Sequence, residues 1–461
     1  MKTNPYVLIC AMLMAVSAEV SAQQKLSVGP LLKTQWHSQS PYNNQCPKIG
    51  EEPCEAGSTA ALMAMVMKYY RYPQTGRGNI SYKLASSDVM VNYDFEKDHF
   101  DWENMLDDYY GVETTQMQLD AVGNLIASCG ASVAMQYVKS GSTANAYNIP
   151  YALINTYGYN PNLVYYDRDY FSDEEWYKIV DRELDAGRPI MYGGQTTNDW
   201  RLRFIVDGRN EEGLYHVNWG LAHNATRTYN GYYNLDTLQL AVWTDGKIYS
   251  KTNYKFSEDQ TMTCGICPTE QGVHEDVFYA NTFSLANGVV KVDQTCDYAL
   301  GPIYCRTTRS GGEVLVRDVL ATVGVGLFDA DFNYIQSLYG RTVKCKTSSN
   351  SLGNMSGNIR FDATIFEDGK KYYIAPYVLV DGENRPTRIR TWKGKTNHYL
   401  AEVENGQIKL SLMGDANGET SIRNIEKDAS DYAVYTLSGI QIPHVRKSGV
   451  YIVNGKKYLS K

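Results

Sequence analysis

The sequence predicts an α+β chain in which a region of mixed helices and strands is followed by a region of strands alone. Residues 56–70 and 172–185 have the apolar spacing of helices, and short apolar runs between 189 and 235 predict antiparallel strands. From about 269 to 412 helical periodicity is absent, and short strands at regular spacing predict an immunoglobulin-like β-sandwich. The 38 tyrosines and 38 glycines also favour a chain rich in strands and turns.

Length and charge restrict the class of protein. At 461 residues the chain is too long for one ordinary hydrophobic core, so two or three domains are expected. Hydrophobic residues make up 43% and charged residues 21%, which is a globular composition. The net charge is -7 and no block of like charges occurs, so no nucleic-acid partner is expected.

Residues 1–22 have the features of a signal peptide. Lys2 gives a positive start, an apolar stretch at 7–16 is too short to span a bilayer, and "VSA" ends at Ala22 in a small-x-small cleavage site. A lipoprotein signal would use Cys10, but Ile9 precedes it where a small residue is expected. No later run is long enough for a transmembrane helix, so we expect an exported protein, extracellular or on the outer cell surface.

The region 23–268 is expected to form one α+β domain. The 56–70 helix is apolar nearly all round and should be buried. The 172–185 helix begins with a capping box of Ser172 and Glu175 and ends at Gly187. The predicted strands of the antiparallel sheet are "PIMYGG", "RFIVDG", "LYHVNWG" and "GYYNL".

The rest of the chain divides into three parts. In the predicted β-sandwich at 269–412, Asn287-Gly288 has the pattern of a hairpin turn. The segment 413–430 is a polar linker, and 431–461 is expected to form a small β module.

Eight cysteines remain after the signal segment, which permits disulfides in an exported chain. Cys46 with Cys54, and Cys296 with Cys305, are plausible bridges because each pair flanks a short loop. The "CGIC" at 264–267 has no second CxxC or histidine pair beside it, so neither a metal nor another cofactor is expected.

Residues 28–268 resemble the streptopain family, papain-fold cysteine proteases of clan CA that bacteria secrete. The resemblance rests on segments in family order: "VGPLLKTQW", "PYNNQCP", "GSTAALMAMVMKYYRYP", "YGYN", "FSDEEWYKIVDRELDAGRPIMYGG", "FIVDG" and "YHVNWG". The last 30 residues resemble the sorting tails of Bacteroidetes that type IX secretion recognises, through "VYTLSG" and "SGVYIVNGKK". An ordinary terminal hairpin is the alternative for that tail.

The resemblance implies a cysteine at the start of a helix and a histidine on a facing strand. The helix dipole and the imidazolium lower the pKa of the thiol, which then attacks as a thiolate. In the register fixed by Gly57 and the Lys68-Tyr69-Tyr70 run, the cysteine position is Ser58. In the register fixed by Phe204, the histidine position is Leu202. Both catalytic residues are therefore expected to be absent.

Two further positions depart from the family pattern. The family's oxyanion glutamine falls on Ser38, and Gln39 lies one place late. The family's "NWGWGG" becomes "NWGLAH", which keeps Trp219 but puts Leu221 at the active-site tryptophan and His223 at the end. The sequence therefore gives one list of candidate cleft residues: Gln39, Arg201, Arg203, Trp219 and His223.

Other residues could restore chemistry. Cys54 could be a nucleophile, although a structural disulfide with Cys46 explains it as well. His216 or His223 could act as the base, the former being otherwise a packed strand residue. Ser58 could come from a laboratory substitution, which would not explain Leu202, or it could be a helix N-cap or a small packing residue.

We therefore expect a secreted streptopain-family homologue without peptidase activity, in which a retained cleft binds an extended peptide or protein. Arg201 and Arg203 either favour acidic ligands or are solvated edge charges. The tail would engage secretion or surface-attachment machinery. The alternatives are a divergent endopeptidase with a recruited base, and a structural or adhesin-like surface protein.

Overall fold

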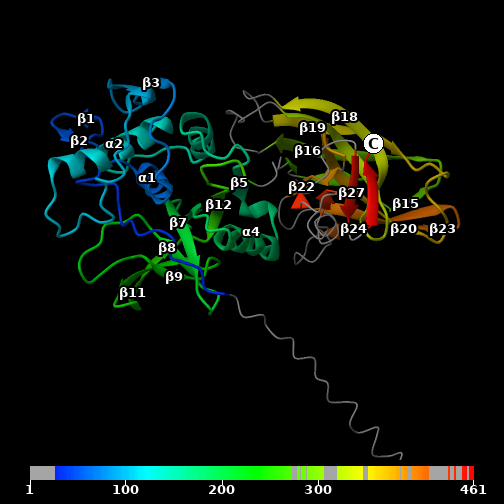
Figure 1. Ribbon diagram of the computed structural model, residues 1–461. Coiled ribbons are helices and arrows are strands. Elements are labelled where there is room, and N and C mark those ends of the chain that lie inside the picture. Colours follow the sequence, from blue (N-terminus) through cyan, green and yellow to red (C-terminus); the bar gives the residue numbers. More distant parts are fainter. Residues whose placement is uncertain are drawn as a thin grey trace, which may run out of the picture.

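The computed structural model describes residues 26–271 and 278–414, apart from short gaps at 281, 287, 306–318, 346–350, 385 and 392–395, and four strands between 434 and 460 (Figure 1). The predicted signal peptide lies outside the described residues. So does the predicted linker, except for residues 413 and 414, which end the last strand of the second region.

The first region carries all the α-helices that the described residues form. They are α1 Ser58–Tyr70, α2 Gln116–Ser132, α3 Asn148–Tyr151 and α4 Asp173–Asp185, with shorter turns η1 Phe95–Lys97, η2 Ala152–Thr156 and η3 Arg168–Tyr170. Both predicted helices are confirmed, including the capping box in which Ser172 and Glu175 satisfy each other's backbone N–H groups.

α2 was not predicted from the sequence, although Thr115 and Gln118 form a capping box at its start. Two glycines weaken its helical pattern, and the structure shows why they are there. A Cβ on Gly123 would lie 1.7 Å from the side chain of Asn44, and one on Gly130 would lie 2.1 Å from the hydroxyl of Tyr137. The two glycines lower the helix propensity of α2 but allow these neighbouring side chains to pack closely against it.

A six-stranded antiparallel sheet forms the other half of this region, in the order β5-β12-β6-β7-β8-β9. Its strands are β5 Val164–Asp167, β12 Glu258–Cys264, β6 Ile190–Gln195, β7 Arg201–Arg209, β8 Tyr215–Asn218 and β9 Gly231–Tyr233. Three hairpins stand beside it: β1 Lys48–Ile49 with β2 Glu52–Pro53, β3 Asn79–Lys83 with β4 Met90–Asp94, and β10 Gln239–Thr244 with β11 Lys247–Lys255. The predicted α+β class is confirmed.

Two hydrophobic cores hold this region together. One surrounds α1 and α2, and the other lies between the sheet and α4. Figure 1 shows α1 and α2 above the strands β7, β8 and β9, and α1 packs against β7. The start of α1 and the start of β7 therefore lie where the helical half meets the sheet half.

The second region contains strands alone among its described residues. One sheet has the order β14-β16-β13-β22 with β19 on β16, and the other has β15-β24-β23-β20-β17-β18 with β21 on β20. Their bounds are β13 Phe278–Ala280, β14 Phe283–Leu285, β15 Gly288–Lys291, β16 Thr295–Cys305, β17 Val319–Phe328, β18 Tyr334–Cys345, β19 Ser351–Arg360, β20 Lys371–Val380, β21 Thr387–Arg388, β22 Arg390–Thr391, β23 Thr396–Glu404 and β24 Gln407–Gly414. Both sheets contribute to one buried core.

The hairpin predicted at Asn287-Gly288 is wrong. β14 pairs with β16 in one sheet, whereas β15 pairs with β24 in the other. The chain therefore crosses between sheets at this point, which a turn signal alone does not reveal. The immunoglobulin-like topology of this region stays a prediction.

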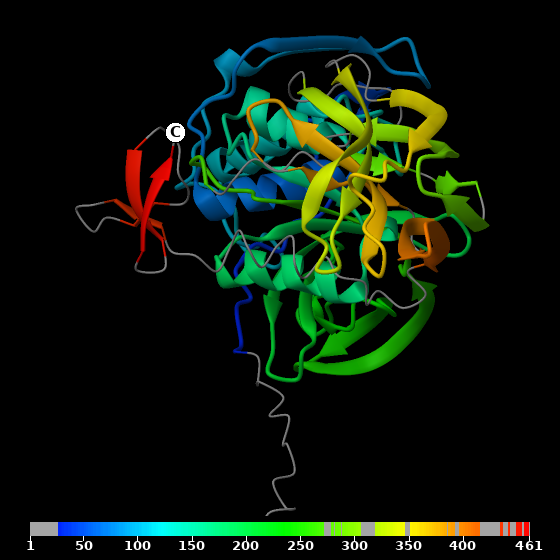
Figure 2. The ribbon, with the colours of Figure 1, turned by 90° about the vertical axis from the view of Figure 1, so that its right-hand side faces the viewer.

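The last four strands form a sheet in the order β26-β25-β27-β28. They are β25 Val434–Thr436, β26 Gln441–Ile442, β27 Gly449–Val453 and β28 Lys456–Ser460. In Figure 2 these red strands stand to one side of the two larger regions. The sorting role of this segment stays a prediction.

Candidate functional site

Ser58 is the first residue of α1. The N-cap is Gly57, whose φ of 81° is in the left-handed region. A Cβ there would lie 2.8 Å from the side chain of Met135 and 2.9 Å from the carbonyl oxygen of Ser142. The interpretation of Ser58 as the cap is therefore wrong, since glycine fills that position for steric reasons. Ser58 is half-buried at the positive end of the helix dipole.

Leu202 is the second residue of β7, where it pairs with Gly194 of β6. Ser58 and Leu202 both line one cavity of about 540 Å³, which we call the Ser58 cavity. Its wall is completed by residues 142–147, the segment 165–170, the end of β6 and the starts of β7 and β12. The two positions that the sequence assigned to nucleophile and base thus face the same space.

No histidine or cysteine lines the Ser58 cavity among the residues that the structure describes. A serine hydroxyl needs a positioned base to become a nucleophile, because its pKa is far above that of a thiol. Leucine cannot accept a proton. Among the described residues, the lining of the Ser58 cavity therefore contains no imidazole that could activate the Ser58 hydroxyl.

The charges of the Ser58 cavity are mixed. Arg201 forms an ion pair with Asp259 at 3.2 Å, and Arg203 donates to the hydroxyl of Thr261 at 2.6 Å. Together with Asp167 and Asp169, the lining holds three carboxylates and two guanidinium groups. This arrangement does not support the expectation that the two arginines favour acidic ligands.

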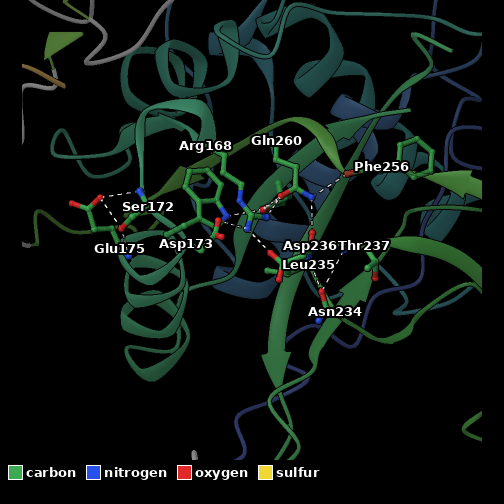
Figure 3. A network of polar contacts seen from close by, with 12 residues as sticks. Arg168, Ser172, Asp173, Glu175, Asn234, Leu235, Asp236, Thr237, Phe256 and Gln260 are labelled. Atoms are coloured by element: carbon green, nitrogen blue, oxygen red, sulfur yellow. Dashed lines mark hydrogen bonds and ion pairs between the residues drawn. The ribbon is translucent and has the colours of Figure 1, made fainter. Parts of the chain in front are cut away.

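Asp169 and Tyr170 of η3 line the Ser58 cavity, and Arg168 of the same turn anchors η3 through the polar network in Figure 3. Its guanidinium donates to Asp173 at 3.0 Å and also contacts Asp236 and Gln260. Gln260 in turn donates to the carbonyl oxygens of Leu235 at 2.6 Å and Phe256 at 3.1 Å. The Arg168 side chain is only 12% exposed, so this network holds η3 on β12 and on the turn after β9.

The second region contacts the same wall. The ring of Tyr170, which lines the cavity, lies 4.3 Å from that of Tyr279 on β13. Arg390 of β22 pairs with Glu175 at 3.1 Å, and its guanidinium lies 4.0 Å above the ring of Phe171. No local pattern in the sequence predicts these contacts, because they join segments more than 100 residues apart.

The oxyanion candidates lie beside the entry to α1. The carbonyl oxygen of Ser38 accepts the N–H of Ala56 at 2.8 Å. Gln39 is exposed and donates to Glu55 at 3.0 Å. Neither residue lines the Ser58 cavity, whose amide side chains are instead those of Asn145 and Gln195.

Trp219 is not a cleft residue. It is fully buried, with its ring 4.6 Å from Phe204, 5.4 Å from Tyr233 and 5.4 Å from Phe256. It belongs to the core between the sheet and α4. The sequence placed it in the cleft because its motif neighbours the active site in the family, but Trp219 follows the end of β8 and its ring packs into the core.

The two candidate bases are held elsewhere. His223 pairs through Nε2 with Asp108 at 2.8 Å, and His216 pairs through Nδ1 with Asp207 at 2.6 Å. Both imidazoles line a second cavity that shares no lining residue with the first. Neither histidine therefore serves Ser58.

All eight cysteines that the structure describes are buried, and none of them is joined in a disulfide. The expected bridges are thus not formed. Burial raises the pKa of Cys46 to about 12, with a further contribution from nearby Cys54, and burial also raises the pKa of Cys54. A thiol of raised pKa is a poor nucleophile, which argues against Cys54 in that role.

Two further findings concern the class of protein. No group of three or more metal-ligating side chains occurs among the described residues, including those around "CGIC". No described helix is long and apolar enough to cross a membrane.

Comparisons with known proteins agree on the first region. Residues 36–233 match the peptidase C10 family. Streptopain of Streptococcus pyogenes is 30% identical over 215 residues, covering 43% of this chain and 52% of the relative. The thiol protease/hemagglutinin PrtT of Porphyromonas gingivalis is 24% identical over 252 residues, covering 52% of this chain and 28% of the relative. The chain thus spans about half the length of the streptopains that it matches.

Among solved structures, active wild-type interpain A of Prevotella intermedia is 31% identical, with a TM-score of 0.46, covering 52% of this chain and 94% of the interpain chain. A prointerpain A fragment of the same organism is also 31% identical, with a TM-score of 0.44. The match over 36–233 and the ordered motifs show that the first region of the chain is a streptopain-like domain of the peptidase C10 family.

Proposed function

We propose that this chain is an exported, catalytically inactive member of the family that binds extended peptide or protein segments in the Ser58 cavity. The observation that carries the proposal is that Ser58 and Leu202 both line the same cavity. Losing one partner of a catalytic pair removes most of the rate enhancement, and losing the second then costs little more. Both partners are replaced here, so residual turnover should be negligible.

The retained cavity supports binding without cleavage. Its volume of about 540 Å³ is within the range of ligand sites, and its walls combine tyrosines with groups of both charge signs. Such a lining suits a peptide, whose backbone offers donors and acceptors. We infer no preference for acidic segments, because Arg201 is already paired with Asp259.

Export is part of the proposal. It rests on the signal-peptide pattern at 1–22 and on the sorting-type pattern at 431–461. We propose that the tail engages secretion or attachment machinery, and that the peptide-binding region therefore acts outside the cell.

The test uses the chain from Gln23 onward with casein as the probe. Intact casein should remain after prolonged incubation, while casein-derived peptides should bind. Ala144→Trp, which fills the Ser58 cavity, should weaken that binding at least about tenfold, whereas Ala225→Trp, on the wall of the second cavity, should not. Cleavage of casein, or equal binding by both variants, would contradict the proposal.

The runner-up, an endopeptidase with a recruited base, predicts casein cleavage that Ser58→Ala abolishes. Cleavage that survives Ser58→Ala but ends with His223→Ala or Cys54→Ala would point to a relocated active centre instead. The positions of both residues, one in a separate cavity and one in the core, weigh against this candidate.

A second candidate is adhesion, favoured by one observation: the Porphyromonas gingivalis relative is called a hemagglutinin as well as a protease. In that case the chain should agglutinate red blood cells, and Ala144→Trp should leave agglutination unchanged. Agglutination that falls with Ala144→Trp would instead assign cell binding to the Ser58 cavity.

A further inference from the structure

A second cavity, which we call the Tyr110 cavity, has a volume of about 750 Å³. It is lined by Pro30 and Gln35, the loop 108–111, His216, residues 223–228 and 230–232, Trp243 and the turn at 245–246. The loop 108–111 belongs to the helical half, and most of the other residues belong to the sheet half or to the β10–β11 hairpin, whose strand β11 lies at the lower left of Figure 1. The site described above uses none of these residues.

Two carboxylate–imidazole pairs set the hydrogen-bonding character of this cavity. Asp207 is fully buried. One of its carboxylate oxygens is hydrogen-bonded to Nδ1 of His216, and the other accepts the N–H of Leu32 at 2.9 Å. One carboxylate oxygen of Asp108 is hydrogen-bonded to Nε2 of His223, and the other accepts the N–H of Tyr110 at 3.0 Å. A carboxylate that accepts one ring N–H leaves the opposite nitrogen of a neutral imidazole as an acceptor.

Donors and further acceptors come from the loop after β8. Asn224, Thr226 and Asn230 line the same space, and Asn230 already accepts the N–H of Trp219 at 2.9 Å. The guanidinium of Arg227 lies 4.7 Å above the ring of Tyr249. The lining thus offers many neutral polar groups and no large excess of either charge.

Aromatic rings form the apolar part of the wall. Tyr110 is 51% exposed, and its ring lies 5.7 Å from that of His223. Trp243 is held rigidly: a Cβ on Gly231 would lie 2.3 Å from its indole, and its Nε1 donates to the hydroxyl of Tyr233 at 2.8 Å. Tyr232 packs edge-on against His216 at 5.3 Å. Rigid amphipathic rings of this kind bind ligands at low entropic cost.

We propose that the Tyr110 cavity binds a neutral saccharide. A sugar ring has an apolar face that stacks on aromatic side chains, and its hydroxyl groups both donate to imidazole or carboxylate acceptors and accept from amides. The balanced charge argues against a strongly ionic ligand. The volume of about 750 Å³ is large enough for more than one sugar unit.

The experiment titrates the chain from Gln23 onward with maltotriose, cellotriose and chitotriose, monitored by saturation-transfer NMR and tryptophan fluorescence. At least one should bind saturably below about 10 mM. Tyr110→Ala should weaken that binding about fivefold or more, while Tyr151→Ala, which removes another exposed tyrosine, 42% exposed on α3, should not. Circular dichroism confirms that each variant is folded.

Cavity-filling variants separate this inference from the proposed function. Ala225→Trp should reduce saccharide binding, and Ala144→Trp should leave it unchanged. Failure of all three saccharides to bind would overturn the proposal, as would equal binding by the Tyr110→Ala and Tyr151→Ala variants. Neither result bears on peptide binding in the Ser58 cavity.

Discussion

Cysteine at position 58 and histidine at position 202 should together produce a reactive thiol at the start of α1. In Ser58→Cys the new thiol would be the only one lining the Ser58 cavity among the described residues, and the eight native cysteines that the structure describes are buried. The helix dipole stabilises a thiolate there by about 0.3–1 kcal/mol, which lowers its pKa to about 8.

Adding Leu202→His should lower that pKa further. An imidazolium about 5 Å from the thiolate contributes about 3 kcal/mol at an effective dielectric constant of about 20, or roughly two pKa units. The thiol of the double variant should therefore titrate near pH 6. Its casein cleavage should still be about 10²–10³ times slower than in an intact site, since Ser38 replaces the oxyanion donor.

The assay is the pH dependence of alkylation by iodoacetamide, followed by mass spectrometry of the folded chain from Gln23 onward. The wild-type chain should remain unlabelled, Ser58→Cys should react with a midpoint at about pH 8, and the double variant should react with a midpoint about two pH units lower. Coincident profiles for the single and double variants would show that position 202 does not face position 58. Rapid labelling of the wild-type chain would refute the claim that its thiols are shielded.

Three further predictions concern stability. Arg390→Ala should lower the free energy of unfolding, measured by urea denaturation, by about 2–4 kcal/mol, because it removes the ion pair with Glu175 and the contact with Phe171. Glu175→Gln can keep the capping box, so it should lose only part of this free energy. An unchanged free energy of unfolding in both variants would show that the two regions do not dock there. Burial lowers the pKa of His398 to about 3. Between about pH 6.5 and pH 3, this histidine is therefore protonated in the unfolded chain but not in the folded one. The free energy of unfolding should fall as the pH falls through that window, by at most about 5 kcal/mol. His398→Phe should flatten this loss in pH-dependent thermal melts, and an unchanged slope would assign the loss to other groups. Gly57→Ala should lower the free energy of unfolding, measured by thermal denaturation, by about 1–3 kcal/mol, because the φ of Gly57 is 81° and the space for a Cβ is occupied. An unchanged stability would mean that this turn can relax.

Local sequence signals were enough for much of the first region. α1 and α4 were predicted within two residues of their bounds, because burial periodicity and a capping box are encoded within a few positions. The prediction that Ser58 and Leu202 occupy the catalytic positions also rests on short neighbouring motifs. By contrast α2 was missed, because Gly123 and Gly130 serve contacts that the linear pattern does not show.

The cysteines and the second region show where local reasoning stops. Closeness in sequence suggested a bridge between Cys46 and Cys54, but the structure places both as buried thiols. The Asn287-Gly288 signal suggested a hairpin, but its flanking strands enter different sheets, since strand pairing is decided by the packing of the whole sandwich-like core.

By itself, the sequence determined that the first region is a streptopain-like domain, and its short motifs predicted that Ser58 and Leu202 occupy the positions of the catalytic cysteine and histidine. Only the tertiary structure decided that Ser58 and Leu202 share one cavity, that Trp219 is buried, and that His223 belongs to a separate space. The reason is physical. Helix and strand patterns depend on neighbours a few residues apart, whereas a cavity is formed by side chains from distant segments whose positions are fixed by packing.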